Sequence, residues 1–160
     1  FPSVAMSLAI AEPKTGEVFY DLGAGAGKAV FCAALLNDWK KCYGIEFLPA
    51  LHDCTSELLK KLREMPEARQ HFQAALDRIE FVQNDILQTD FSDGDVVYMN
   101  ATAFTPDLWD SIVPKLEQLK SGARIILLTK RLNKEKFSLI QETLLPMSWG
   151  MNSVLVYKRN

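Results

Sequence analysis

Short apolar runs alternate with helix-forming stretches along most of this sequence. Apolar runs of this length, bounded by turn residues, are typical of buried strands, and they cover residues 18–22, 41–46, 79–83, 95–99 and 123–129. Strands that alternate with helices form βαβ units, which require a mostly parallel sheet. We therefore expect an α/β fold with helices on both faces of the sheet.

The intervals between these runs carry helical signals. Leucines at helical spacing predict a long amphipathic helix through Leu51, Leu58, Leu59 and Leu62, which Pro66 ends. Thr105 and Pro106 are typical of a helix start, and Pro114 is expected to kink or restart that helix. Further helices are expected over residues 28–37, 67–76 and 134–142.

The stretch 144–157 is expected to form two strands joined by a tight turn at residues 150–152. Five alternating units followed by an antiparallel hairpin describe the seven-stranded, Rossmann-like sheet of the class I methyltransferases. A length of 160 residues suits one such domain. We expect residues 1–160 to be a single domain of this kind, either whole or trimmed from a longer chain.

Composition narrows the classes of partner. The formal net charge is −2, whereas domains that hold nucleic acid by counterion release are normally basic. No apolar run reaches the length of about 18 residues that a membrane-spanning helix needs. Neither nucleic acid nor membrane is therefore expected as the main partner.

The cysteines give no sign of a metal site. Cys32, Cys42 and Cys54 lack the spacing of zinc ligands, and only His52 and His71 are available to join them. Apolar cores readily hold free thiols. We expect no metal and a reduced intracellular protein, in the nucleus or the cytoplasm.

A glycine-rich segment, DLGAGAG at residues 21–27, follows the first predicted strand. Open α/β sheets bind ligands at this position, and glycines let the backbone approach a ligand. A P-loop would need Gly at Leu22 and Ser or Thr at Ala29, and a dinucleotide fingerprint would need Gly or Ala at Lys28. The spacing fits S-adenosylmethionine (SAM) instead, with contacts expected from Asp21, Gly23, Ala24, Gly25 and Gly27.

Acidic residues near this segment fit the charge and hydroxyl groups of SAM. The methionine half carries an ammonium and a sulfonium, so an Asp21 carboxylate attracts it but would repel a pyrophosphate; the alternative is that Asp21 caps the turn. Glu46 ends the second predicted strand and is expected to accept ribose hydroxyls, which SAM and NAD share. Asp85 is expected to accept from the adenine amine, with Ile86 and Phe47 against the ring.

Several segments resemble motifs of the Dot1 family of protein-lysine methyltransferases, which have the class I fold and no SET domain. In chain order, residues 21–27 are similar to DLGSGVG, 44–46 to GVE, 84–87 to GDFL, 99–104 to VNNFAF and 119–125 to LKPGARI. The resemblance spans residues 16–130. It implies SAM as the cofactor and a protein lysine as the methyl acceptor, with histones among the candidates. Ala101 and Thr102 depart from the family's Asn and Phe.

The acceptor side is expected to suit a lysine amine. Methylation of exocyclic amino groups usually uses a [DNS]-P-P-[YFW] motif, whose prolines are missing here, and no cysteine follows Cys54 to attack a cytosine. A lysine amine, with a pKa of about 10.4, must lose its proton, which an apolar channel favours. We expect Asn100 to hold the substrate or SAM amino group by hydrogen bonds, and Phe104, Tyr98 and Trp149 to form the walls. Core packing is the alternative role for Phe104 and Trp149.

A basic cluster follows the fifth predicted strand, at Lys130, Arg131, Lys134 and Lys136. It is expected at the edge of the sheet that carries the site, either as a solvated helix face or as a dock for an acidic protein surface or a phosphate backbone. It is the only feature that favours nucleic acid. Two alternatives to protein-lysine methylation stay open: a methyltransferase acting on a small molecule or RNA, and a SAM-binding partner subunit without catalysis.

Overall fold

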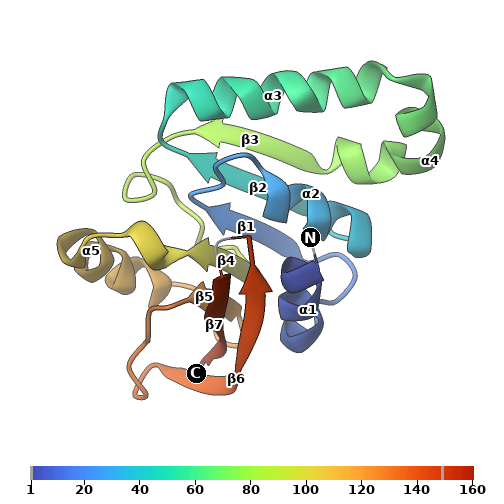
Figure 1. Cartoon of the computed structure of the whole chain (residues 1–160). Helices are drawn as coiled ribbons and strands as arrows, with labels where there is room; N and C mark the ends of the chain where they lie inside the picture. Colours follow the sequence, from blue (N-terminus) through green and yellow to red (C-terminus); the bar gives the residue numbers. More distant parts are fainter. Residues whose placement is uncertain (1, 149) are drawn as a thin grey trace.

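The computed structural model describes residues 2–148 and 150–160. A seven-stranded sheet runs through the molecule in the order β3-β2-β1-β4-β5-β7-β6 (Figure 1). Its strands are β1 (Val18–Leu22), β2 (Lys41–Glu46), β3 (Ile79–Gln83), β4 (Val96–Asn100), β5 (Arg124–Leu128), β6 (Phe137–Met147) and β7 (Gly150–Arg159). Strands β1 to β5 are parallel, and β7 is antiparallel to both β5 and β6. The expected mostly parallel sheet with a terminal hairpin is confirmed.

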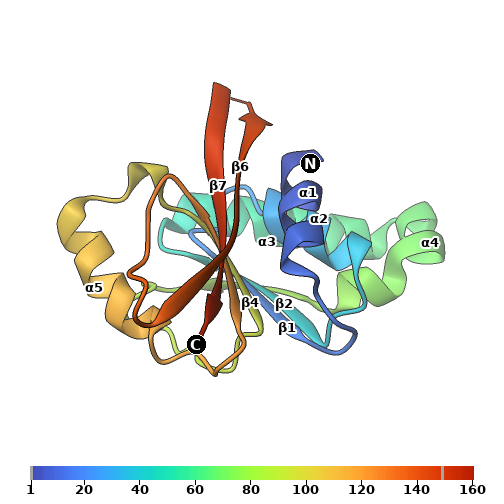
Figure 2. The ribbon, with the colours of Figure 1, turned by 90° about the horizontal axis from the view of Figure 1, so that it is seen from below.

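Helices cover both faces of this sheet, as expected. They are α1 (Pro2–Ala11), α2 (Lys28–Leu36), α3 (Pro49–Glu64), α4 (Pro66–Asp77), the short 3-10 helix η1 (Ala101–Ala103) and α5 (Pro106–Leu116). Figure 2 shows α1 to α4 on one side of the sheet and α5 on the other. Among the described residues, no helix is both long and apolar enough to cross a membrane.

Alternate side chains of the central strands fill two separate cores. Phe19 of β1 and Val96 of β4 pack into the core beneath α1 to α4, while Tyr20 and Val97 pack into the core beneath α5. All of β1 is buried. Burial on both faces is typical of a central parallel strand and explains why its sequence is apolar apart from Asp21.

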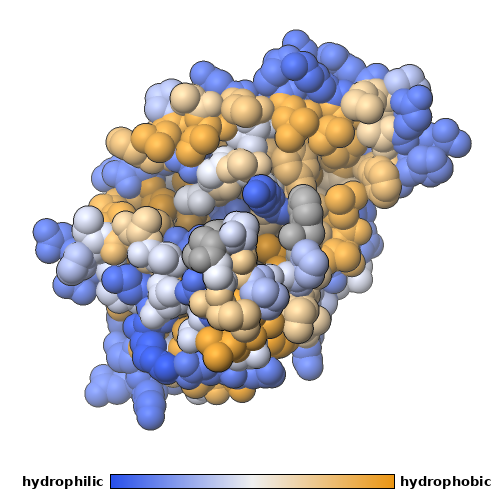
Figure 3. Space-filling model, viewed as in Figure 1, coloured by the Kyte–Doolittle hydropathy of each residue, from blue (hydrophilic) through white to orange (hydrophobic). Residues whose placement is uncertain are grey.

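Helix α3 buries only part of its predicted apolar stripe. Leu59 is 5% exposed and Leu62 packs against the same core, but Leu51 and Leu58 are 39% and 44% exposed. Along α3 the surface is mixed, with hydrophobic patches beside hydrophilic side chains (Figure 3). The prediction of an amphipathic helix holds, and the stripe is wider than the face that the sheet covers.

Two predictions about helices are wrong. Pro114 does not restart the helix, because α5 runs without a break from Pro106 to Leu116 with Pro114 in its last turn. The expected start is confirmed, since Thr105 Oγ1 accepts a hydrogen bond from Leu108 N at 3.3 Å. Residues 134–142 form no helix; most of them belong to β6, where pairing with β7 overrides their helical propensity.

The C-terminal hairpin is confirmed, but its turn comes earlier than expected. Met147 pairs with Gly150, so residues 150–152 begin β7. The end of the hairpin extends beyond the rest of the sheet (Figure 2). Trp149, a predicted channel wall, lies outside the described residues.

Candidate active site

The predicted site residues come together at the carboxyl ends of the parallel strands. Because β1 to β4 are parallel, their carboxyl ends meet there, where open α/β sheets bind ligands. The glycine loop (residues 23–27) follows β1, Glu46 ends β2, Asp85 follows β3 and Asn100 ends β4. Segments far apart in the sequence thus contribute to one site.

The conformation of the glycine loop explains its composition. Gly23, Gly25 and Gly27 have φ angles of 86°, 53° and 71°, in the left-handed region that favours glycine. Gly23 N donates to Ile45 O at 2.9 Å, which ties the loop to β2. A Cβ on Gly27 would lie 2.7 Å from the side chains of its neighbours, whereas a Cβ on Gly25 would meet no atom within 4 Å. Packing therefore requires Gly27, and Gly25 faces open space.

Glu46 supports the loop through its carboxylate. It is 7% exposed, and its two oxygens accept hydrogen bonds from Gly25 N and Leu48 N, each at 2.8 Å. A carboxylate offers about four lone-pair positions, so each oxygen keeps one for a further donor. The arrangement suits two neighbouring hydroxyl groups, as on a ribose.

Asp21 is a buried carboxylate in need of a cation. It is 3% exposed, and none of the described residues donates a hydrogen bond to its carboxylate. Burial, reinforced by the nearby Glu46 carboxylate, raises the pKa of Asp21 from 3.8 to about 7. A ligand ammonium would compensate this charge. Asp21 does not cap the turn, because no backbone N–H among the described residues bonds to it.

A cavity of about 570 Å³ opens in front of Asp21. The glycine loop and the first turn of α2 form one side, the ends of β4 and β6 another, and the first turn of α1 closes it. Its lining residues are Pro2, Ser3, Val4, Asp21, Gly23, Ala24, Gly25, Ala26, Lys28, Ala29, Tyr98, Asn100, Pro146, Met147 and Ser148. The volume is within the usual range for small-molecule sites.

Asp85 lies in a turn, and only one of its two carboxylate oxygens accepts a hydrogen bond from the described residues. Its Oδ1 accepts from Leu87 N at 2.8 Å, while Oδ2 accepts no hydrogen bond from the described residues. Ile86 is buried in the core beneath α5, and Phe47 is 64% exposed. These residues lie outside the cavity, on the side of the loop where Glu46 stands, and their contact with adenine stays a prediction.

Asn100 faces the cavity with a fixed amide. Its Oδ1 accepts from Thr102 Oγ1 at 2.8 Å and from Thr102 N at 3.4 Å, and no described residue accepts from its Nδ2. Thr102 stands where the resemblance expects Phe, so this amide orientation is a feature of this chain. The free group of Asn100 is a donor.

Tyr98 and Phe104 border the site from different faces of the sheet. Tyr98 is 6% exposed, lies opposite Asp21 in the β1–β4 register and lines the cavity. Burial and the Asp21 carboxylate raise the pKa of its hydroxyl, so it stays protonated at neutral pH. The Phe104 ring lies beside Gly23, 3.7 Å from the position a Cβ would take there.

The wall that α1 and β6 build was not predicted from the sequence. Ser3 Oγ donates a hydrogen bond to Pro146 O, which joins the first turn of α1 to the end of β6 across the cavity. No local pattern predicted α1, and residues so far apart in sequence carry no common motif. Lys28, which departs from the dinucleotide fingerprint, also lines the cavity.

A family model and a curated relative identify the family of this chain. The family model described as histone methylation protein DOT1 matches residues 4–148. The chain belongs to this family. A histone-lysine N-methyltransferase, H3 lysine-79 specific, from Gibberella zeae is 32% identical over 114 residues, which are 70% of this chain and 23% of that protein. The chain thus spans about a quarter of the length of this curated Dot1 relative.

Solved structures agree on the fold. An RNA methyltransferase from Salinibacter ruber in complex with S-adenosyl-L-homocysteine has a TM-score of 0.76 and 24% identity, over 99% of this chain and 90% of that one. Magnesium protoporphyrin IX methyltransferase from Synechocystis PCC 6803 with bound SAM has a TM-score of 0.73 and 16% identity, over 99% and 77%. At such identities these likenesses establish the fold alone, that of the class I methyltransferases.

The basic cluster of this Dot1-family chain is not assembled as expected. Lys136 O accepts from Asn160 N at 3.0 Å, and Gly122 N, just before β5, donates to Arg159 O, so Lys136 lies at the opposite edge of the sheet from the site. Arg131 is engaged by Glu142 of β6 at 2.6 Å. The prediction of one basic patch beside the site is wrong, because residues 129–136 run across the sheet to the start of β6.

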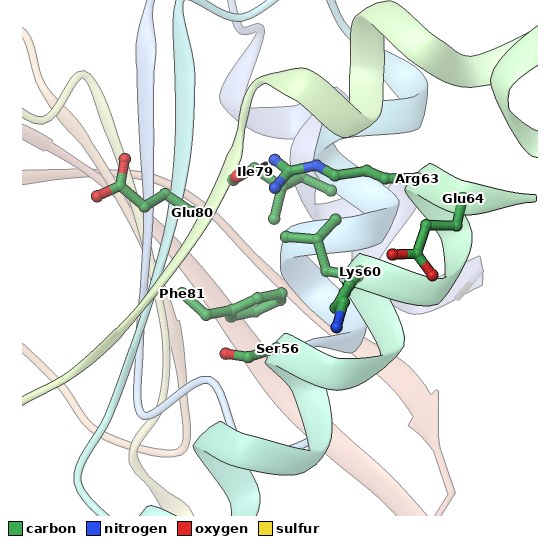
Figure 4. Close-up of a pocket in the computed structure, with 8 residues that line it drawn as sticks. Ser56, Lys60, Arg63, Glu64, Ile79, Glu80 and Phe81 are labelled. Carbon is green, nitrogen blue, oxygen red and sulfur yellow. Dashed lines mark hydrogen bonds between the residues drawn. The ribbon is translucent and has the colours of Figure 1, made fainter.

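A second cavity, about 440 Å³, lies between α3 and the edge of β3 (Figure 4). The Arg63 guanidinium crosses it and donates to Leu76 O and Ile79 O at 2.8 Å and 2.9 Å. Arg63 thereby ties α3 to the end of α4 and the start of β3. No predicted site residue lines this cavity, and within the described residues no three His, Cys, Asp or Glu side chains group as metal ligands.

Proposed function

We propose that this domain transfers a methyl group from SAM to the side-chain amine of a protein lysine. The observation that carries the proposal is Asp21, a buried carboxylate that faces a cavity beneath a glycine loop and accepts no hydrogen bond from the described residues. A carboxylate in that state is stabilised by a cationic ligand. Membership of the Dot1 family favours SAM over other ligands that carry an ammonium.

The residues present fit the whole cofactor. Asp21 would hold the methionine ammonium, and Glu46, already aligned by Gly25 N and Leu48 N, would accept the ribose hydroxyls. The free Oδ2 of Asp85 would accept from the adenine amine, with Ile86 and Phe47 in apolar contact with the ring. When bound, SAM supplies a methyl group on a positively charged sulfur.

The acceptor amine must arrive unprotonated. Tyr98 and Phe104 are aromatic, and the side chain of Met147 borders the same cavity as Tyr98. Such surroundings disfavour an ammonium, so they lower the pKa of an entering lysine from about 10.4. Holding the amine in line with the methyl group then supplies the remaining rate through orientation.

Asn100 is better placed to donate than to accept. Because Thr102 occupies its Oδ1, the available group is Nδ2, which suits a carboxylate or carbonyl oxygen of the cofactor or substrate. This modifies the expectation that Asn100 holds an amino group. Asn100 would position the reactants while leaving the amine lone pair free.

A protein lysine is the favoured acceptor because the family and the curated relative point to histone lysines. A histone substrate would place the protein in the nucleus. We propose that residues 1–160 form one SAM-binding domain, and that other parts of a longer protein would select the histone site.

Radiolabelled SAM and a cell lysate test this function. Label should enter protein, survive nuclease and disappear on protease treatment, and purified core histones should accept label as lysine methylation. Asp21→Asn is the control that should abolish the signal. Label in RNA or in small molecules would contradict the proposal, as would SAM binding without transfer to any acceptor.

A further inference from the structure

Strand β6 is an edge of the sheet that leads into the cavity. It pairs with β7 on one side, and no strand formed by residues 2–148 or 150–160 pairs with its other side. Side chains on both of its faces are exposed from Ser138 to Glu142, and Leu144 is 63% exposed. Its last residues, Pro146 and Met147, line the cavity in front of Asp21. An extended chain lying along β6 would therefore run towards the site.

The hydrogen bonds of β7 determine which backbone groups of β6 are free. Thr129 N donates to Ser153 O, so Ser153 directs its backbone groups towards β5 and its neighbours Asn152 and Val154 direct theirs towards β6. These two residues pair with Leu145 and Thr143. The backbone groups of Leu145 and Thr143 thus bond to β7. The backbone N–H and C=O groups of Glu142 and Leu144 point away from β7, towards the open side of β6.

The open groups are the N–H and C=O of Glu142 and Leu144. No described residue bonds to them. Pro146 has no N–H, and its carbonyl already accepts from Ser3 Oγ. Such a row of unpaired donors and acceptors is a template for an added strand.

A bulge at one end and a proline at the other limit the part of β6 that can pair with an added strand. The register shifts between Leu139 and Gln141, which leaves Ile140 unpaired, and Pro146 ends the row of donors. Bulges and prolines protect edges against unlimited pairing between copies. What stays open is a short segment, residues 141–145, which suits a short extended peptide rather than a second sheet.

We propose that the protein substrate docks as an extended segment by strand addition to β6 at residues 141–145, which directs its lysine into the cavity. This inference rests on the proposed function and specifies how its acceptor is bound. From Leu144 to Met147 the distance along a strand is about 10 Å, so the segment and the cavity are close enough for one peptide to use both. Recognition through backbone groups requires an unfolded segment and little sequence specificity.

Two methyl acceptors distinguish an effect on substrate docking from an effect on methyl transfer itself. One is a short unstructured peptide with one central lysine among threonines and alanines, and the other is N-acetyl-lysine amide, which is too small to pair with β6. Leu144→Pro removes the outward N–H at an edge position that tolerates proline. It should raise the KM for the peptide about tenfold, the effect of one lost backbone hydrogen bond with its partner left unpaired. The rate with N-acetyl-lysine amide and the affinity for SAM should not change.

A matched variant and modified peptides complete the test. Leu144→Ala keeps the backbone N–H, so its KM for the peptide should rise much less than that of Leu144→Pro. With the wild type, backbone N-methylation should raise KM at alternate positions of the peptide and not at those between, because only alternate N–H groups face β6. That measurement stands even where Leu144→Pro fails to fold.

Three results would count against strand addition. Equal KM values for Leu144→Pro and Leu144→Ala would overturn it, and so would N-methylated peptides without an alternating effect. A wild type that forms dimers lost in Leu144→Pro would assign this edge to self-association instead. A wild type that binds SAM but methylates neither acceptor would overturn the proposed function itself.

Discussion

Replacing Asp21 by Asn tests the charge on which the site is built. Burial and the neighbouring Glu46 carboxylate raise the pKa of Asp21 from 3.8 to about 7. A carboxyl group whose pKa is raised on folding binds its proton more tightly in the folded protein than in the unfolded chain. Its ionisation therefore lowers stability as the pH rises from 3.8 towards 7, and the full cost applies above that pH.

The size of the effect follows from the same pKa values. Complete ionisation costs about 4 kcal/mol, because one pKa unit corresponds to about 1.36 kcal/mol. About half of this cost is present at pH 5.5 and all of it at pH 8.5. Relative to the wild type, Asp21→Asn should therefore gain about 2 kcal/mol in the free energy of unfolding between these pH values. The cost of an unpaired amide, about 1–3 kcal/mol, does not depend on pH and cancels in the comparison.

Thermal unfolding without ligand, followed by circular dichroism at pH 5.5, 7 and 8.5, measures this gain. It should appear as roughly 4–8 °C in Tm, at about 2–4 °C per kcal/mol for a domain of this size. Asp110→Asn, at an exposed position of α5, is the matched control and should show no such trend. SAM should raise the Tm of the wild type and not that of Asp21→Asn. A difference in Tm that is the same at all three pH values would refute the account of Asp21.

Three further substitutions test separate parts of the site. Glu46→Ala should weaken SAM about ten- to a hundred-fold, since it removes charged hydrogen-bond acceptors, and calorimetry showing an unchanged Kd would exclude Glu46 from the site. Gly25→Val should abolish SAM binding with the fold retained, because a side chain there enters open space, whereas Gly27→Ala should lower the Tm; normal binding by Gly25→Val would mean the loop is misplaced. Asn100→Ala should reduce single-turnover rates at saturating SAM by about a hundred-fold, with Phe104→Ala weaker in the same direction, and a wild-type rate for Asn100→Ala would remove it from the reaction.

The parts of the fold that could be predicted are those whose residues carry their own signal. The parallel strands β1, β2, β4 and β5 are largely buried on both faces, so each is a short, mainly apolar run between turns, whereas β3 at the edge of the sheet exposes Glu80 and Gln83. Strand β6 is exposed on both faces over much of its length, and Lys134, Glu135 and Lys136 lie just before it, with Gln141 and Glu142 inside it. These residues favour a helix, and pairing with β7 makes the segment a strand instead. Helix α1 is apolar without a polar face, which leaves no helical period to detect.

The same distinction applies to the site. Asp21, Glu46, Asp85 and Asn100 could be found because each stands where a predicted parallel strand ends, and such ends share one edge of the sheet. The wall made by Ser3 and Pro146 could not, because these residues are 143 positions apart and meet only through tertiary packing. The basic cluster was expected beside the site because it follows β5, but residues 129–136 cross to the start of β6, and only tertiary structure determines that path.

Isothermal calorimetry with SAM, S-adenosyl-L-homocysteine and NAD tests the central claim most directly. All three ligands share the adenosine that Glu46 and Asp85 would bind, but only the first two carry the ammonium that Asp21 requires. We predict that both SAM and its demethylated product bind, that NAD does not, and that Asp21→Asn binds neither SAM nor the product. Tight binding of NAD with no response to SAM would contradict it.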